Sequence, residues 1–167
     1  MQTDNIIRIM DITYSSSVDG IGFRDVLFVN YCPHHCDECH NPETWDKKNG
    51  RDVTVSEVYE KLMKSKICNV TLSGGEPFEQ PKALLKLVKM IKENSDKTIW
   101  AYSGYTFQQL LEDDDKKALL KECEVLVDGR FDKTKKGLNL RFKGSENQRI
   151  IDVQKSFEQN EVVLWEG

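Results

Sequence analysis

Strand-like and helix-like segments alternate along this 167-residue chain, and that alternation is what most constrains its fold. Short apolar runs rich in β-branched and aromatic residues predict strands at 26–29, 70–72, 98–102 and 125–127. Two further short strands are predicted at 149–153 and 162–165. Strands that alternate with helices form parallel β-α-β units, so the sequence predicts an α/β fold with mostly parallel strands.

Capping signals and apolar spacing predict the helices between these strands. Thr54 and Glu57 have the spacing of a capping box, and the apolar residues that follow share one helical face. Pro81 suits the first position of a second helix, whose apolar residues recur at helical spacing. Further helices are predicted at about 106–112 and 116–121.

The length of the chain limits how these units can close. A complete eight-fold β/α barrel needs roughly 250 residues. The sequence therefore predicts a partial, open β/α barrel, with residues 1–167 forming a single domain.

Polar and glycine-rich segments directly follow four of the predicted strands, at 32–39, 73–77, 103–104 and 128–130. In parallel α/β folds, the C-terminal ends of the strands form the ligand-binding face. We therefore expect these four segments to converge on one site, although they lie far apart in the sequence.

Three of the five cysteines, Cys32, Cys36 and Cys39, lie within eight residues. Thiolates are soft ligands that suit zinc or iron–sulfur clusters. A structural zinc site normally has four protein ligands, and an ordinary electron-transfer 4Fe–4S cluster has four cysteines. Three thiolates on a four-iron cluster leave one iron open, as a cluster that binds a substrate requires.

A zinc site stays open as the alternative for this cysteine cluster, with His34, His35 or His40 as the fourth ligand. Cys68 and Cys123 lie near predicted apolar segments, and for them a place in the core is expected.

The spacing C-x3-C-x2-C resembles the signature of the radical S-adenosylmethionine superfamily. A second segment, Ser73-Gly74-Gly75-Glu76-Pro77, resembles the superfamily's G-G-E-P segment, which receives the methionine amino group. Glycines let the backbone approach a ligand closely, and carbonyls and a carboxylate accept hydrogen bonds from an ammonium group. Taken alone, the segment also fits a tight turn before a helix.

Within that superfamily, the chain is similar to the activases of glycyl radical enzymes, most closely those of anaerobic ribonucleoside-triphosphate reductases. The matching segments cover nearly the whole chain: 18–24, 32–45, 73–77, 102–106, 126–131 and 144–149. The chain departs from the pattern at Ile21, where the family often has proline. It also has Glu38 where many superfamily members carry an aromatic residue that packs on adenine, which leaves the backbone of Glu38–His40 as the adenine contact.

The resemblance implies that Cys32, Cys36 and Cys39 hold one 4Fe–4S cluster that reductively cleaves S-adenosylmethionine. The resulting radical then abstracts hydrogen from a glycine of the partner reductase, and a flavodoxin-like protein is the implied electron donor. No catalytic side chain is implied beyond the cofactor ligands. A radical enzyme acting on a small molecule is the alternative activity, and a zinc-binding interaction module is the alternative from another class.

The resemblance also implies a set of cofactor contacts around the predicted site. The residues are Glu38, Cys39, His40, Gly74, Gly75, Glu76, Pro77, Ser103, Asp128 and Arg130. Turn formation is the alternative role for Ser103, and a surface ion pair is the alternative for Asp128 and Arg130. The segment 19–22 fits a turn or a substrate-facing loop, and residues 147–148 are expected near the site without an assigned role.

The charge pattern points to neither a nucleic acid nor a membrane as a partner. The net charge is −4, with lysine and arginine interspersed among the acids rather than clustered. No segment approaches the roughly 18–20 consecutive apolar residues of a membrane span. The first residues lack a secretory signal pattern, so a cytoplasmic location is expected, where thiols stay reduced.

Overall fold

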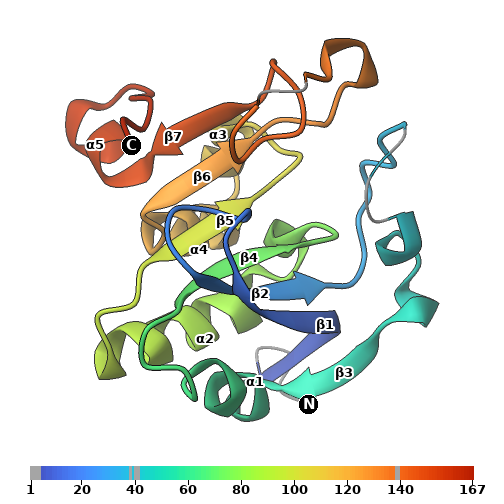
Figure 1. Ribbon diagram of the computed structural model, residues 1–167, viewed down its shortest axis with the longest axis vertical. Helices are drawn as coiled ribbons and strands as arrows, with labels where there is room; N and C mark the ends of the chain where they lie inside the picture. Colours follow the sequence, from blue (N-terminus) through green and yellow to red (C-terminus); the bar gives the residue numbers. More distant parts are fainter. Residues whose placement is uncertain (1–4, 38, 40–41, 138–139) are drawn as a thin grey trace.

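Seven strands form one sheet among the described residues of the computed structural model, which are 5–37, 39, 42–137 and 140–167 (Figure 1). The strands lie in the order β3-β1-β2-β4-β5-β6-β7. Their bounds are β1 (Ile6–Ser16), β2 (Arg24–Val29), β3 (Arg51–Thr54), β4 (Asn69–Gly74), β5 (Ile99–Tyr102), β6 (Val125–Asp128) and β7 (Arg149–Asp152).

The centre of the sheet is parallel and its two sides are antiparallel. The pairs β2–β4, β4–β5 and β5–β6 are parallel. Strand β1 pairs antiparallel with β2 and β3, and β7 pairs antiparallel with β6. The predicted α/β fold is confirmed, but the sheet is mixed rather than mostly parallel, because antiparallel strands flank the parallel centre.

Two strands were missed and one predicted strand is shorter than expected. Strand β1 pairs with β2 through two register shifts, after Ile9 and after Thr13, and such irregularities interrupt a simple alternating pattern. Strand β3 has only four residues. The strand predicted at 162–165 is reduced to one bridge, between Ile151 and Leu164, and the helix at 153–159 was not predicted.

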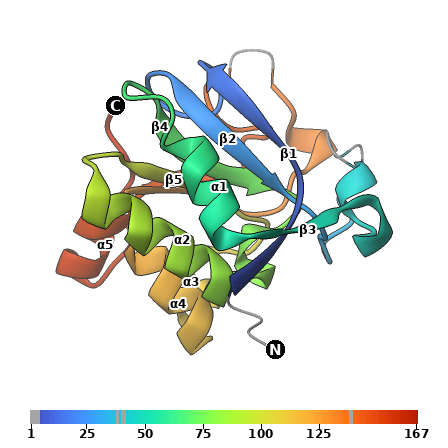
Figure 2. The ribbon, with the colours of Figure 1, turned by 90° about the horizontal axis from the view of Figure 1, so that it is seen from below.

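The helices begin where the capping signals indicate. Thr54 accepts a hydrogen bond from the Glu57 amide at 3.1 Å, Pro81 lies in the first turn of its helix, and Thr106 forms a capping box with Gln109. The bounds are α1 (Val55–Leu62), α2 (Pro81–Asn94), α3 (Phe107–Leu111), α4 (Asp114–Lys121) and α5 (Val153–Gln159). Helices α1 to α4 lie together over one face of the sheet (Figure 2).

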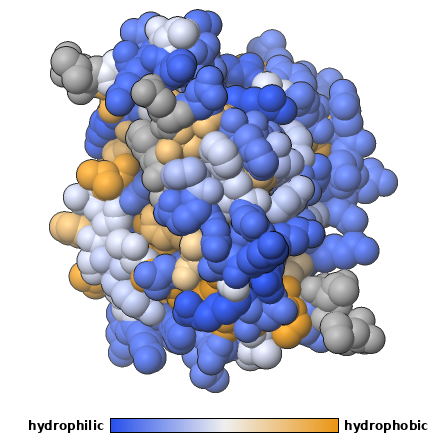
Figure 3. All heavy atoms as spheres, turned by 90° about the vertical axis from the view of Figure 1, so that its right-hand side faces the viewer, coloured by the Kyte–Doolittle hydropathy of each residue, from blue (hydrophilic) through white to orange (hydrophobic). Residues whose placement is uncertain are grey.

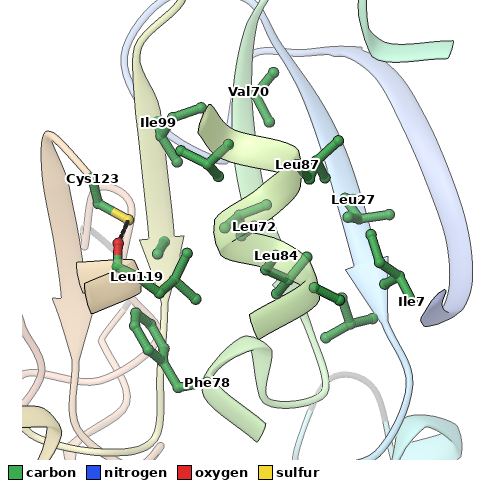
Figure 4. Packing of buried hydrophobic residues seen from close by; sticks show 14 of the residues in the cluster. Ile7, Leu27, Val70, Leu72, Phe78, Leu84, Leu87, Ile99, Leu119 and Cys123 are labelled. Atoms are coloured by element: carbon green, nitrogen blue, oxygen red, sulfur yellow. Dashed lines mark hydrogen bonds between the residues drawn. The ribbon is translucent and has the colours of Figure 1, made fainter. Parts of the chain in front are cut away.

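The main hydrophobic core lies between these helices and the sheet. Leu84 and Leu87 of α2 are fully buried and pack toward Leu72 on β4 (Figure 4). Cys123 belongs to the same cluster, and its thiol donates a hydrogen bond to the Leu119 carbonyl at 3.5 Å. Cys68 is also buried, so both remaining cysteines occupy the interior as expected.

The opposite face of the sheet carries a smaller cluster around Trp100, Val125 and Val127. Because side chains alternate along a strand, Ile99 and Ala101 face the helices while Trp100 between them faces the other side. The Arg24 guanidinium lies 5.6 Å from the Trp100 ring centroid and is fully buried. Burial lowers the pKa of Arg24 to about 10, which leaves it charged at neutral pH.

The surface is largely hydrophilic on the side drawn in Figure 3, where hydrophobic residues appear in several separate areas. Of the helices formed by the described residues, none has the length and apolar character needed to cross a membrane.

We expect Leu87→Ala to lower the free energy of unfolding by about 2–5 kcal/mol, because it removes buried methyl groups and leaves a cavity under α2. Urea denaturation measures this change. Lys89→Ala on the same helix is the matched control, because Lys89 is exposed and its loss should change stability by less than about 0.5 kcal/mol. Equal effects of the two substitutions would contradict this packing.

Candidate active site

The loops that follow the four parallel strands surround one cavity of about 760 Å³. Its walls include Cys32, Cys36 and Cys39 after β2, Ser73, Gly74 and Gly75 at the end of β4, Ser103 and Gly104 after β5, and Gly129 and Phe131 after β6. The expected convergence of the four segments is confirmed. The volume lies within the roughly 300–1,000 Å³ of small-molecule sites.

Burial disfavours the thiolate forms of Cys32 and Cys36, and backbone N–H groups near the sulfur atoms partly oppose that effect. Burial raises the pKa of the Cys32 thiol to about 11, while backbone N–H groups of His34 and His35 act in the opposite direction. Burial also raises the pKa of Cys36, and the Phe131 N–H and the nearby charge of Arg130 lower it. Hydrogen bonds to sulfur are one means by which proteins stabilise iron–sulfur ligands.

The predicted contacts Glu38 and His40 lie outside the described residues. Cys39 is described and lines the cavity together with Cys32 and Cys36.

Two glycines bring the end of β4 against the backbone that leads into the cysteine loop. Gly74 has a φ of +109°, and a Cβ there would lie 2.4 Å from the Val29 nitrogen. A Cβ on Gly75 would lie 2.3 Å from the Tyr31 carbonyl oxygen. The Glu76 amide donates to that same Tyr31 carbonyl at 2.8 Å. Only glycine allows this approach, because any side chain at either position would collide with backbone atoms.

Glu76 and Pro77 are buried and do not line the cavity. The Glu76 carboxylate accepts hydrogen bonds from His34 Nε2 at 2.7 Å and from the Gly104 amide at 2.8 Å. It also accepts from Ser103 Oγ at 2.9 Å and from the Phe78 amide at 3.0 Å. The carboxylate therefore holds loops together, and the cavity-facing part of the predicted segment is Ser73–Gly75.

Asp128 and Arg130 lie beside the site without forming a pair with each other. The Asp128 carboxylate is 1% exposed and pairs with Arg149 at 2.6 Å. It also accepts a hydrogen bond from the Phe107 amide at 2.8 Å, at the start of α3. Arg130 is exposed, and its backbone carbonyl accepts from Asn147 at 2.9 Å. Neither side chain belongs to the cavity wall, although Arg130 is near enough to Cys36 to affect its pKa.

Two further segments line the cavity, and the sequence indicated them only in part. One is the hairpin loop between β1 and β2, which contributes Ser17, Val18, Asp19, Gly22 and Phe23. The other is the segment after β6, which contributes Leu140, Arg141, Phe142, Lys143 and Gly144 together with Gln148. Gln148 fixes that segment, because its amide donates to the Gly129 carbonyl and accepts from the Gly144 amide at 2.8 Å. The sequence allowed a substrate-facing role for residues 19–22 and placed residues 147–148 near the site, whereas residues 140–143 carried no signal.

Comparisons with known proteins agree with this geometry. Residues 18–151 match a family described as a 4Fe–4S single cluster domain. An anaerobic ribonucleoside-triphosphate reductase-activating protein of Vibrio cholerae is 39% identical over 142 residues, which cover 80% of this chain and 90% of that protein. The protein of the same description from Enterobacteria phage T4 is 37% identical over 80% of this chain and 86% of its own length. The chain belongs to this family of reductase-activating proteins.

A more distant relative supports the same grouping. The pyruvate formate-lyase-activating enzyme of Clostridium pasteurianum is 37% identical over 60% of this chain, but the match covers only 44% of that enzyme. The similarity to the reductase-activating family thus extends over more of both chains than the similarity to this second kind of activating enzyme.

The residues of the site fit the 4Fe–4S cluster that the family description names. Three cysteines reach one cavity, and backbone N–H groups point toward the sulfur atoms of Cys32 and Cys36. Within the described part of the chain, no three His, Cys, Asp or Glu side chains are grouped as ligands of a single metal ion. The family match favours the iron–sulfur interpretation of the cysteines over zinc.

We expect anaerobic reconstitution to give about four iron atoms per chain, and Cys36→Ala to abolish this iron uptake, because a three-cysteine site cannot lose a ligand. Iron analysis and the visible absorption spectrum measure the result. Cys123→Ala and Cys68→Ala are the controls and should retain the iron, since both thiols are buried away from the cavity. Stoichiometric zinc without iron uptake would contradict the assignment.

Proposed function

We propose that this protein activates an anaerobic ribonucleoside-triphosphate reductase by forming a glycyl radical on it, using S-adenosylmethionine as the second cofactor. The observation that carries the proposal is the arrangement of the cavity, in which Cys32, Cys36 and Cys39 face the same space as Ser73–Gly75. The family to which the chain belongs and its named relatives support the same activity. A cytoplasmic location, where thiols stay reduced, suits such a site.

When bound, the cluster supplies one-electron reduction of the S-adenosylmethionine sulfonium, which yields methionine and a 5′-deoxyadenosyl radical. Cys32, Cys36 and Cys39 would hold the cluster and leave one of its irons without a protein ligand. A flavodoxin-like protein is the proposed source of the electron. The chain's own residues bind and orient the cofactors and exclude competing reactions.

The end of β4 is suited to the amino acid end of S-adenosylmethionine. Gly74 and Gly75 place no side chain between the cavity and the strand backbone, so an ammonium group can approach backbone carbonyls there. The Glu76 carboxylate already accepts hydrogen bonds from two side chains and two amides. The carbonyls are therefore the acceptors that remain for the ammonium group.

The remaining walls suit a nucleoside and a flexible substrate. Tyr102, Phe131 and Phe142 give the cavity aromatic lining, and apolar lining excludes water from a reactive radical. Val18 and Phe23 line the cavity from the β1–β2 loop and are 73% and 58% exposed. A protein loop carrying the target glycine can reach the cavity past these two exposed side chains. The partial barrel predicted from the length would provide the same opening.

The reduced protein with S-adenosylmethionine should produce a glycyl radical on an anaerobic ribonucleoside-triphosphate reductase, seen as a doublet in electron paramagnetic resonance. The radical should be absent with Cys36→Ala, which removes a proposed cluster ligand. If 5′-deoxyadenosine forms without a radical on the reductase, while a small molecule is consumed, the activase proposal is wrong. The small-molecule radical enzyme would then be the better description.

Ser73→Phe should weaken S-adenosylmethionine binding by at least about tenfold while leaving the iron content unchanged, because the new ring occupies the cavity beside Gly74. Equilibrium dialysis of the reconstituted protein measures the affinity. Lys89→Phe adds the same ring on the exposed side of α2 and should bind normally. Unchanged affinity in Ser73→Phe would show that the cofactor binds elsewhere.

A further inference from the structure

A buried pair of side chains connects the cysteine loop to the rest of the site. His34 lies between Cys32 and Cys36, and its Nε2 is 2.7 Å from Glu76 Oε1. The two side chains are 3% and 0% exposed. A buried carboxylate is costly unless its hydrogen-bonding capacity is filled, so the contacts of Glu76 are informative.

Glu76 forms hydrogen bonds within the loop after β4 and with the loops after β2 and β5. Through His34 it binds the loop after β2, and through the Phe78 amide it binds its own segment after β4. Ser103 Oγ lies 3.0 Å and 2.9 Å from its two oxygens, and the Gly104 amide donates at 2.8 Å, so the loop after β5 is held as well. The carboxylate is thus a common acceptor for three strand ends.

His34 is also enclosed by the loop after β5. A Cβ on Gly104 would lie 2.4 Å from His34 Cδ2, so the glycine leaves the space that the imidazole fills. The Tyr105 ring meets the imidazole edge-on, with centroids 4.6 Å apart. The Tyr105 hydroxyl donates to Glu79, and Lys116 lies 4.2 Å above the Tyr105 ring, which fixes that ring in turn.

We propose that His34 and Glu76 are a positioning pair, which sets the loop of the cluster cysteines against the β4 and β5 loops that bind S-adenosylmethionine. The inference rests on the proposed function for the identity of the cofactors. It assigns the Glu76 side chain to the protein's own loops rather than to the methionine ammonium group. Loss of the pair should disturb cofactor binding through the relative placement of the loops.

Hydrogen–deuterium exchange of the cofactor-free protein tests the coupling without any cofactor. His34→Leu removes the imidazole donor from one loop and should speed exchange of the Gly104 amide on another loop by about tenfold or more. His34→Gln offers an amide N–H to Glu76 and should restore slow exchange. Glu43→Gln, at an exposed position after the cysteine loop, is the control and should exchange like the unaltered protein. Unchanged exchange at Gly104 in His34→Leu would overturn the proposal.

Affinity for S-adenosylmethionine distinguishes positioning from direct contact. In the reconstituted protein, His34→Leu and Glu76→Gln should each weaken binding by about tenfold, while the iron content is retained. The double variant should be no weaker than the worse single variant, because both remove one interaction. If Glu76→Gln loses binding while His34→Leu binds normally, the carboxylate contacts the ligand directly and the proposal is wrong.

A replacement variant and two further outcomes distinguish failure of this inference from failure of the proposed function. If His34→Leu fails to fold, His34→Phe takes its place, because it keeps a ring in the space beside Gly104 but removes the donor to Glu76, and it should give the same exchange and affinity changes. A loss of iron in proportion to the loss of affinity in every variant would show a merely structural role and overturn the pair as a positioning device. If the unaltered protein binds no S-adenosylmethionine, the proposed function fails, while the exchange experiment still decides the coupling.

Discussion

The parallel pairing of β2, β4, β5 and β6 is the constraint on which the site depends. Val29 pairs with Gly74, Leu72 with Ala101, and Tyr102 with Val127, so the four strands end at the same edge of the sheet. Each strand is followed at once by a polar or glycine-containing loop, and these loops line the cavity. Segments separated by up to about a hundred residues meet because their strands are in register.

Close backbone contact then turns that edge into a defined cavity. The amides of Gly75 and Glu76 donate to the carbonyls of Val29 and Tyr31, which tie the end of β4 to the chain just before Cys32. These contacts require glycine at positions 74 and 75, because a Cβ would overlap the neighbouring backbone. The placement of the cysteine loop is therefore fixed by main-chain packing as well as by any metal cluster.

Three buried charged side chains connect neighbouring strands and the loops that follow them. Glu76 joins the loops after β2, β4 and β5, and Asp128 joins β6 to Arg149 on β7. Arg24 donates to the carbonyls of Val70 and Thr98 and to Thr71 Oγ1. Buried charges are weak contributors to net stability but costly to leave unpaired, so these networks favour one arrangement of the loops over looser ones.

The sequence by itself determined the local features: the central strands and α1 to α4, through periodicity and caps, and the cysteine spacing that suits a cluster. It also predicted convergence at the strand ends, because that follows from parallel pairing alone. It did not predict β1 and β3, whose bulges and shortness blur the alternation, helix α5, or the cavity wall at 140–143, and it left residues 19–22 open between a turn and a substrate-facing loop. Only the tertiary structure decided that Glu76 and Asp128 bind His34 and Arg149, because hydrogen-bond partners of buried carboxylates are chosen by three-dimensional proximity, which sequence spacing does not encode.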